Sequence, residues 1–388
     1  MKINYHPQVL EIEKKIIEYR RDFHKHPELS FQEHRTSDIV AKELKKFGLK
    51  VLKNIGKTGV VGILEGAKEG KTIALRADMD ALPIQETSNI EYKSINDGVM
   101  HACGHDGHTA ILLGAAKVLS KMKNHIAGTV KFIFQPAEEG LGGARFMIKD
   151  GALNNVDEIY GLHLWNYQKY GTVGIKSGPV MAAADKFKIT ILGKGGHGAT
   201  PQGTTDAIVV AAQTIQTLQT IVSRNTNPLE STVVTIGKIN GGYNFNIIAD
   251  KVVLKGTTRA YTEKNRTLIK NRMKNILKGL EKTFNAKITL EYEDGYPPVI
   301  NHTGQTEKLK KSAEKISPNG IQEPFLSMGG EDFSYFIQKV PGCFFFLGSN
   351  PNDKSITDTP HHCSHFNINE KALILGSSIF VQLIEDML

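Results

Sequence analysis

Hydrophobic positions in the first half of the chain follow two spacings. Apolar residues that recur every three or four positions are typical of amphipathic helices, and short apolar runs are typical of buried strands. Helices that alternate with such strands favour an α/β domain with a largely parallel sheet. The predicted helices span residues 9–25, 35–47 and 107–123, and the predicted strands span 59–65, 72–77, 128–135 and 157–163.

The pattern changes in the middle of the chain, where polar and apolar residues alternate as in half-exposed strands. Residues 185–193 read Asp-Lys-Phe-Lys-Ile-Thr-Ile-Leu-Gly and predict one such strand. The elements that follow complete the order β-α-β-β-α-β, which is the ferredoxin-like arrangement. They span residues 204–223, 231–239, 251–260, 263–284 and 286–293.

This change of pattern indicates an inserted domain. A Gly-Pro pair at 178–179 and a Pro-Pro pair at 297–298 stand at its ends and are typical of linkers. After it the α/β pattern resumes with a strand at 342–347 and a helix at 370–387. We therefore expect a mostly parallel α/β domain that is interrupted by an α+β domain. The expected boundaries are 1–180 and 295–388 for the first and 181–294 for the second.

Composition and charge exclude several classes of protein. The 388 residues exceed one ordinary core and suit two domains. The net charge of +8 comes from Lys and Arg interleaved with Glu, without a recognition motif, so we expect no nucleic-acid partner. We expect neither a membrane span nor a secretory signal, because apolar runs are short and residues 9–23 are rich in charge. The three cysteines make no disulfide framework, which favours the reducing cytoplasm.

The densest chemical signal is residues 100–108, Met-His-Ala-Cys-Gly-His-Asp-Gly-His. Thiolates and imidazoles are the usual ligands of zinc and similar metals. Cys103 and His105 can face one side of an extended turn, and Gly104 lets the backbone bend between them. The alternative is a hydrogen-bonded histidine cluster at the start of a helix, but the pattern favours a metal site.

A second signal follows the strand at 128–135, where Glu138 and Glu139 stand between a Pro and a Gly. Adjacent carboxylates at the end of a buried strand are costly to desolvate, and a bound cation removes that cost. Ligands of open α/β sheets also bind at this edge. One Glu would then bind metal, and the other would act as general base toward a metal-activated water. A Glu pair favoured by the dipole of a helix first turn is the weaker alternative.

Further polar residues are expected at the same edge of the sheet. His163 ends a predicted strand and becomes a candidate ligand in the company of the other groups. Asp78 and Asp80 follow the strand at 72–77, and one of them would orient a metal-bound imidazole. We place Asp80 in the catalytic set, although an ordinary acidic turn explains this pair equally well.

A third cluster of metal-binding side chains lies near the C-terminus. It contains His361, His362 and His365 around Cys363. One of these histidines would complete a dinuclear site, and spacing alone leaves all three open.

The inserted domain carries one histidine on a glycine-rich loop, His197 in residues 193–201. The loop lacks the Gly-Lys-Ser/Thr of a P-loop, so it predicts no nucleotide binding. The histidine could donate a hydrogen bond to a developing oxyanion, whereas the loop by itself is better explained as a surface turn.

Together these motifs carry a resemblance to a known family. The sequence resembles the metal-dependent aminoacylase and hippurate hydrolase family, which are amidohydrolases related to carboxypeptidases and dipeptidases with two co-catalytic metals. The likeness runs nearly end to end, and Cys-Gly-His-Asp followed by Pro-Ala-Glu-Glu-Gly is highly specific. Its motifs are residues 23–31, 75–83, 100–106, 134–140, 195–198 and 328–333.

The resemblance implies a role for each candidate residue. Glu138 would be the general base, and His197 would reach a neighbouring subunit's active site to stabilise the tetrahedral intermediate. Asn246 and Arg259 would contact the substrate carboxylate. The implied fold is a catalytic α/β domain with an inserted dimerisation or lid domain, in a homodimer or higher homo-oligomer. The implied metal ligands are Cys103, His105, Glu139, His163 and His362.

The sequence departs from the family pattern at three places. The family often reads Leu-His-His-Pro where residues 361–364 read His-His-Cys-Ser, and counting back from the next Phe assigns the ligand to His362. Its Asn-x-Ile-Pro-Asp motif lacks the Pro in residues 246–250, which relaxes the turn but removes no functional group. Related peptidases place a metal-binding His where this chain has Asp78.

The resulting hypothesis is an enzyme that cleaves the amide bond of an N-acyl-L-amino acid into a carboxylic acid and a free amino acid. It would use two divalent metal ions per subunit, and zinc, manganese, cobalt and nickel all suit the ligands. A dipeptidase and a biosynthetic deacetylase, such as one acting on N-acetyldiaminopimelate, would share the fold. A metal-dependent binding protein is the alternative from another class, and the presence of Glu138 beside a full ligand set argues against it.

Overall fold

The computed structural model describes residues 2–351 and 358–388, and the chain forms two compact units. The predicted insert ended at residue 294 and lacked a short later segment that joins the second unit. Unit 1 contains Met1–Val180, Ile300–Phe325 and Asp332–Leu388, and unit 2 contains Met181–Val299 and Leu326–Glu331.

Unit 1 is built on an eight-stranded sheet with the strand order β1-β2-β4-β3-β5-β16-β6-β15. The four central strands β4, β3, β5 and β16 run parallel, and β2 and β6 beside them run antiparallel. The prediction of a mostly parallel sheet is therefore confirmed. The strands are β1 (Lys50–Ile55), β2 (Gly59–Glu65), β3 (Lys68–Asp78), β4 (Ala127–Gln135), β5 (Glu158–Lys169), β6 (Val173–Gly174), β15 (Ile321–Gln322) and β16 (Gly342–Asn350).

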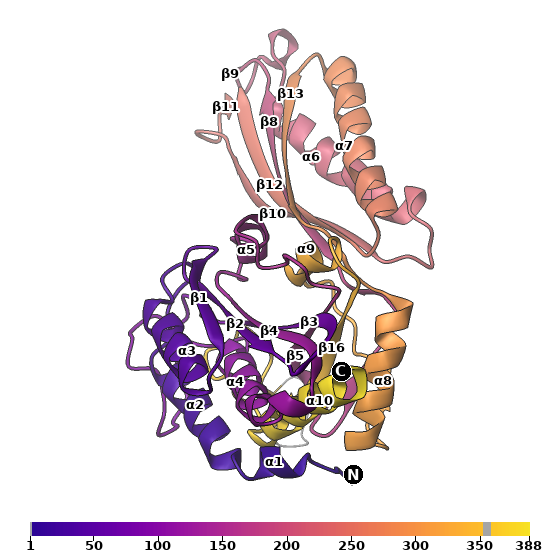
Figure 1. Cartoon of the computed structure of the whole chain (residues 1–388). Helices are drawn as coiled ribbons and strands as arrows, with labels where there is room; N and C mark the ends of the chain where they lie inside the picture. Colours follow the sequence, from indigo (N-terminus) through magenta and orange to yellow (C-terminus); the bar gives the residue numbers. More distant parts are fainter. Residues whose placement is uncertain (1, 352–357) are drawn as a thin grey trace. The chain divides into compact units, whose positions relative to one another are not determined.

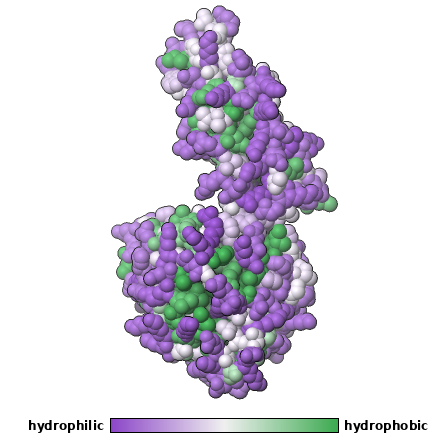
Figure 2. Space-filling view, turned by 45° about the horizontal axis from the view of Figure 1, so that its top comes forward, coloured by the Kyte–Doolittle hydropathy of each residue, from purple (hydrophilic) through white to green (hydrophobic). Residues whose placement is uncertain are grey.

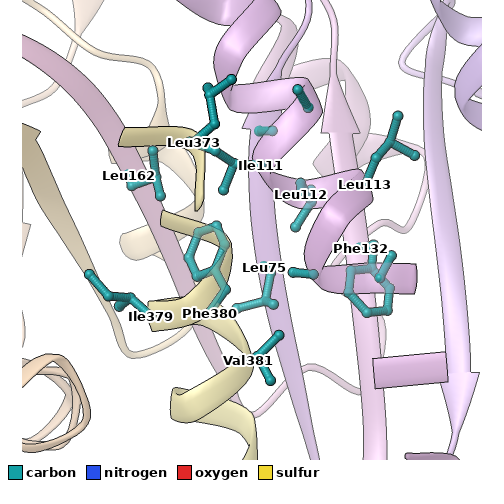
Figure 3. Packing of buried hydrophobic residues seen from close by; sticks show 14 of the residues in the cluster. Leu75, Ile111, Leu112, Leu113, Phe132, Leu162, Leu373, Ile379, Phe380 and Val381 are labelled. Atoms are coloured by element: carbon teal, nitrogen blue, oxygen red, sulfur yellow. The ribbon is translucent and has the colours of Figure 1, made fainter. Parts of the chain in front are cut away.

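Helices cover both faces of this sheet (Figure 1). Helices α4 and α10 pack together on one face, and α2, α3 and α8 extend that layer, while α5 and α9 lie against the other face. Figure 3 shows the main core, in which Ile111 of α4 and Phe380 of α10 meet Leu75 of β3. The helices are α1 (Pro7–Leu10), α2 (Glu13–Lys25), α3 (His34–Lys46), α4 (His105–Lys121), α5 (Gly143–Lys149), α8 (Thr303–Ile316), α9 (Phe333–Ile337) and α10 (Lys371–Met387), with a 3₁₀ turn η1 (Lys123–His125).

Burial explains why the central strands were easy to predict and the outer elements were not. Every residue of β16 is buried, and its first six residues, 342–347, form an unbroken apolar run. Strand β1 at the sheet edge is mostly exposed and has no such run, and the sequence predicted neither it nor α8. The single helix predicted over 9–25 is two helices, α1 and α2, because the chain turns at Glu11 and Ile12.

Unit 2 has the predicted β-α-β-β-α-β order. Its four-stranded antiparallel sheet has the order β10-β12-β8-β13, and α6 and α7 contribute to one core with it. Asp206 and Thr262 begin these helices by accepting backbone N–H groups with their side chains. The elements are β8 (Ala183–Leu192), β9 (Gly196–His197), η2 (Pro201–Gly203), α6 (Ala207–Thr220), η3 (Ile221–Asn225), β10 (Thr232–Gly241), β11 (Ile247–Ile248), β12 (Lys251–Ala260), α7 (Glu263–Phe284) and β13 (Lys287–Tyr296).

Two short strands, β7 (Gly178–Met181) and β14 (Val299–Asn301), form a separate two-stranded sheet. The surface in Figure 2 is mostly hydrophilic, with apolar patches on both units. Within residues 2–351 and 358–388, no helix is both long and apolar enough to cross a membrane.

Candidate metal centre

The chemical side chains of unit 1 gather at the carboxyl edge of its parallel strands. Strand β3 ends at Asp78, and β4 ends at Gln135, its partner in register. His163 lies within β5, and α4 begins at His105. Crossover connections bring the carboxyl ends of parallel strands to one edge, so residues far apart in sequence meet there.

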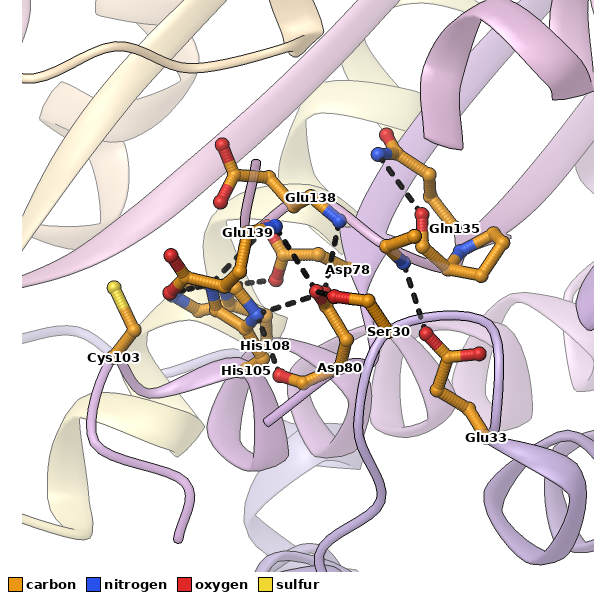
Figure 4. Close-up of polar contacts among 12 residues, drawn as sticks. Ser30, Glu33, Asp78, Asp80, Cys103, His105, His108, Gln135, Glu138 and Glu139 are labelled. Carbon is orange, nitrogen blue, oxygen red and sulfur yellow. Dashed lines mark hydrogen bonds and ion pairs between the residues drawn. The ribbon is translucent and has the colours of Figure 1, made fainter. Parts of the chain in front are cut away.

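The predicted ligand atoms converge in space. Cys103 Sγ lies 3.5 Å from Nε2 of His163. Oε1 of Glu139 lies 3.9 Å from Nε2 of His105 and 3.4 Å from Nε2 of His362. Figure 4 shows the thiol of Cys103 and the carboxylate of Glu139 on the same side as the His105 ring. Three groups with one ligand atom from each residue within 4.8 Å combine these side chains: Cys103, His105 and His163; Cys103, Glu139 and His362; and His105, Glu138 and Glu139.

Hydrogen bonds fix the tautomers of two of these histidines. Nδ1 of His105 is 2.9 Å from the carbonyl oxygen of Asp80, and Nδ1 of His163 is 2.7 Å from that of Leu164. A carbonyl can only accept, so Nδ1 donates in both rings, and in the neutral form of each ring Nε2 presents a lone pair to the cluster. This is how protein structure prepares imidazoles for metal binding.

Two buried atoms in the cluster test whether it fits a cation. Among the described residues, Nε2 of His105 and Oε1 of Glu139 have no hydrogen-bond partner. A buried acceptor without a partner costs about 1–3 kcal/mol. When the His105 ring is neutral, both atoms are acceptors and lie 3.9 Å apart, so a cation between them satisfies both. The donor set of thiol, imidazole and carboxylate suits a borderline divalent metal.

The electrostatics of the cluster depend on burial and on the surrounding carboxylates. Burial raises the pKa of the Cys103 thiol well above its usual range, and Glu139 and Glu138 add to the effect. Burial opposes the charged form of His105, but the nearby Asp78 and Asp80 outweigh it and raise its pKa to about 10. Without a cation, this site therefore favours the thiol form of Cys103 and the protonated form of His105. A bound metal reverses both preferences, because it binds the thiolate and the neutral imidazole.

Asp80 holds the loop that carries the two glutamates. Its carboxylate accepts the backbone N–H groups of Glu138 and Glu139, each at 3.0 Å, and the hydroxyl of Ser30 at 2.7 Å (Figure 4). Oδ1 of Asp80 also lies 3.3 Å from Nδ1 of His105. Burial disfavours its charge, yet the bonds from His105 and Ser30 lower its pKa. Asp80 thus joins one candidate ligand to the loop of the others.

His108 is a site residue whose role the sequence did not reveal. Its Nδ1 donates to Oδ1 of Asp78 at 2.6 Å, and its Nε2 accepts the backbone N–H of Leu164 at 2.8 Å. Both ring nitrogens are occupied, so His108 ties β3 to β5 rather than offering a lone pair to a metal. The sequence signal for this role was the position of His108 in the His-rich segment, about one helical turn after His105.

Arg76 is a second residue that sequence reasoning did not single out. It is fully buried and donates to Asp78 at 2.6 Å, to Gln135 at 2.8 Å and to Asp332 at 3.0 Å. An Arg inside an apolar strand is rarely buried without partners. That rule was the signal that acidic groups lie around it.

The structure separates the three C-terminal histidines. Nε2 of His362 lies 3.4 Å from Oε1 of Glu139, and the backbone N–H of His362 donates to the carbonyl of Ala102 at 2.8 Å. The backbone of His362 is left-handed, with a φ of +65°. His365 is exposed and lies 3.1 Å from the carbonyl of Asp358. The geometry therefore favours His362 as the ligand.

His361 packs among the aromatic rings beside the cluster. Its ring packs at a centroid distance of 4.9 Å from Trp165 and 5.2 Å from His163. Nε2 of His361 accepts the backbone N–H of Asn166 at 3.2 Å. Burial, with His362 adding to the effect, lowers its pKa to about 3, so the ring is neutral and packs like an apolar residue.

Unit 2 places its three candidate residues in a different setting. His197 and Asn246 are exposed, and the backbone N–H of Gly198 donates to the carbonyl of Asn246 at 2.8 Å. These two residues are therefore neighbours within unit 2. Arg259 lies on β12 opposite Ala184 of β8, and burial lowers its pKa.

A parallel sheet that gathers thiol, imidazole and carboxylate ligands at its carboxyl edge, beside a second glutamate, defines a metal-dependent hydrolase. A model of the peptidase family M20/M25/M40 matches residues 74–386, and the chain belongs to this family. It is an enzyme of the amidohydrolase class, as the sequence predicted.

Three related proteins show the range of this similarity. Thermostable carboxypeptidase 2 of Saccharolobus solfataricus is 44% identical, with 95% of this chain and 94% of that protein covered. N-acetyl-L-cysteine deacetylase of Bacillus subtilis is 43% identical, with 94% and 86% covered. The crystal structure of the Bacillus subtilis YXEP protein, a dinuclear metal binding peptidase from the M20 family, is 35% identical with a TM-score of 0.86, covering 97% of this chain and 98% of that chain.

Proposed function

We propose that this enzyme hydrolyses the amide bond of N-acyl-L-amino acids and releases a carboxylic acid and a free amino acid. The observation that carries the proposal is the loop after β4, which brings Glu138 and Glu139 to one cluster of candidate ligands. One relative at 43% identity is an N-acetyl-L-cysteine deacetylase, which supports an N-acylated amino acid as the substrate class.

Two divalent cations per subunit, of zinc, manganese, cobalt or nickel, suit the residues at this edge. When bound, such cations polarise a carbonyl oxygen and acidify water. The YXEP protein, related to this chain, is described as dinuclear, which supports the number two. The residues that would hold them are Cys103, His105, Glu139, His163 and His362.

Glu138 is the general base of the proposed reaction. It is buried, and its backbone N–H is held by Asp80 at 3.0 Å, so its side chain leaves the loop from a fixed point. Its Oε1 lies 3.4 Å from the backbone N–H of Asp332. Glu138 takes a proton from the attacking water, whose oxygen bonds to the carbonyl carbon. It then delivers this proton to the nitrogen of the leaving amine as the C–N bond breaks.

The proposal also assigns roles to three residues of unit 2, His197, Asn246 and Arg259. His197 donates a hydrogen bond to the oxyanion in the active site of a neighbouring subunit, and Asn246 and Arg259 bind the free carboxylate of the amino acid. The exposure of His197 supports this role, because only a side chain on the surface of its own subunit can contact another subunit.

A homodimer or higher homo-oligomer is part of this proposal. Unit 2 exposes 54% of Ile239 at the edge strand β10, 70% of Tyr243 and 97% of Phe245. Exposed apolar side chains beside an unpaired strand edge favour association with another chain. The three cysteines are free thiols, which supports a reducing compartment such as the cytoplasm.

The test is hydrolysis by the purified protein of benzoyl-glycine, a set of acetyl-amino acids and a set of dipeptides. Activity should disappear on chelation and return with one of the four metals. Hydrolysis of the acylated substrates at least tenfold faster than of dipeptides supports the proposal. Faster hydrolysis of dipeptides would overturn it in favour of a peptidase, which the likeness to a carboxypeptidase makes the second candidate.

A further inference from the structure

Glu33 is a buried carboxylate that the proposed mechanism does not use. It stands in the turn between α2 and α3, and none of its surface is exposed. Its Oε1 accepts the backbone N–H of Phe31 and that of Ala137, each at 2.9 Å. Its Oε2 accepts the hydroxyl of Thr58. Within residues 2–351 and 358–388, Glu33 belongs to no group of possible metal ligands.

The two residues that share this oxygen are both in a left-handed conformation. Phe31 has a φ of +62° and Ala137 has a φ of +55°. Neither is a glycine, so each conformation costs about 1–2 kcal/mol and persists only where the surroundings impose it. One carboxylate oxygen bonds the N–H of both, and it therefore holds two strained residues from two different loops.

The position of Ala137 connects this strain to the chemistry. It directly precedes Glu138, so its φ sets the direction in which the chain presents Glu138. The loop also closes tightly after these residues. At Gly143 a side chain would meet the carbonyl of Pro136 at 1.7 Å, and the backbone N–H of Gly143 donates to the carbonyl of Ala137 at 3.0 Å.

Neighbouring contacts bind the same two loops to each other. Ser30 donates to Asp80, which accepts the N–H groups of Glu138 and Glu139. The ring of Phe31 packs edge-on against Phe146 of α5 at 5.2 Å. Figure 4 shows Ser30 and Glu33 directed at the loop that follows Gln135.

The burial of Glu33 is costly. Burial raises its pKa to about 7, and the nearby Asp80 adds to the effect. An apolar side chain would fill this space without that cost, but it would leave the N–H groups of Phe31 and Ala137 without an acceptor. What the carboxylate supplies here is a hydrogen-bond acceptor at a fixed point.

We propose that Glu33 is a positioning residue that holds Ala137 in its left-handed conformation and thereby directs Glu138 at the reacting atoms. The inference rests on the proposed role of Glu138. It predicts that loss of the acceptor at residue 33 lowers turnover while the metal ligands, which are held by other contacts, keep their metal.

The experiment compares Glu33→Leu with Glu33→Gln in the full, metal-loaded enzyme. Glu33→Leu removes the acceptor, and we expect kcat to fall about 100-fold, with KM changed less than about threefold and metal content unchanged. Glu33→Gln keeps an acceptor oxygen and should retain at least about a third of the turnover. Leu309→Ala, a buried substitution in α8, is the control for lost stability and should keep kcat.

A second substitution tests the strain itself. Glycine adopts a left-handed φ at no cost, so Ala137→Gly should make the loop less dependent on Glu33. In that background we expect Glu33→Leu to lower kcat only about tenfold, a coupling that a double-mutant cycle measures. Equal losses in both backgrounds would overturn the proposal, as would wild-type kcat in Glu33→Leu or loss of metal in step with activity.

Amide hydrogen exchange of residues 137–140 provides a readout without substrate. Faster exchange in Glu33→Leu than in Glu33→Gln supports the positioning role, and equal protection in both overturns it. If the wild-type enzyme hydrolyses dipeptides rather than acyl-amino acids, the proposed function fails, and the same kcat comparison is made with a dipeptide.

Discussion

The candidate residues of unit 1 and those of unit 2 are held in opposite ways. In unit 1, His105, Asp80 and Glu138 are at most 6% exposed, and each is fixed by bonds to others in the set. In unit 2, His197 and Asn246 are exposed, the ring of His197 accepts the backbone N–H of Ala199, and the carbonyl of Asn246 accepts that of Gly198. The residues of the first set hold one another within their own unit, whereas those of the second set have no such network around them among the described residues.

This difference teaches what a buried polar network can reveal. A buried carboxylate or imidazole must be paired, so its partners disclose the use to which it is put. An exposed histidine is satisfied by water, and its surroundings are compatible with many roles. The evidence for the metal centre therefore comes from the molecule itself, while the role proposed for His197 depends on family resemblance.

The largest expected effect comes from separating the two adjacent glutamates of unit 1. Glu138→Ala should lower kcat on the order of 10³–10⁴-fold, because the proton of the attacking water loses its acceptor. Metal content, measured by atomic emission, should stay near that of the wild type. In Glu139→Ala, the matched control, both metal content and activity should fall. Wild-type turnover in Glu138→Ala would remove it from the mechanism.

A smaller effect is expected from unit 2. His197→Ala should lower kcat about 100-fold, as loss of one oxyanion donor does elsewhere, with metal content and thermal stability unchanged. The exposed His125 of unit 1 is the control, and His125→Ala should behave like the wild type. If His197→Ala keeps full turnover, the exposed loop is only a surface turn.

The smallest expected effect is on stability, and it comes from a carboxylate of unit 1 to which the proposed mechanism gives no role. Glu158 at the start of β5 accepts from Lys308 at 2.6 Å and Lys71 at 3.0 Å. Although burial opposes it, these bonds lower its pKa from 4.5 to about 2. Because the pKa of Glu158 is lower in the folded than in the unfolded protein, its charged form stabilises the fold above pH 4.5. This stabilisation is lost as the pH falls toward 2.

Glu158→Gln should therefore lower the free energy of unfolding by about 1 kcal/mol at pH 7, after allowance for the exposure of the lysines. Urea unfolding at pH 7, 5 and 3 should show the gap between variant and wild type shrinking with acid, with kcat unchanged. A gap that is constant across this range would contradict the assigned pKa.

Much of the fold was predictable because burial leaves a direct trace in the sequence. The apolar run of 342–347 predicted β16, and the alternation of 185–193 predicted β8. The exposed edge strand β1 and helix α8 left weaker traces and were not predicted. Candidate ligands could be predicted where two metal-binding residue types stand close together in sequence, as Cys103 and His105 do.

The supports of the site could not be predicted, because they depend on distance in space. Glu33 contacts Ala137 across 104 positions of sequence, and Arg76 contacts Asp332 across 256. No local spacing encodes such pairs, and a lone Glu or Arg in a pattern usually denotes an exposed residue.

The sequence by itself determined the α/β pattern of unit 1, the β-α-β-β-α-β order of unit 2 and the chemical types of the candidate ligands, since each is expressed in a local pattern. The tertiary structure decided which of the three C-terminal histidines faces Glu139, which ring nitrogens carry protons and which carboxylates hold the loop of Glu138. Those choices belong to folding, because hydrogen bonds and burial form only when distant segments meet at the edge of the sheet.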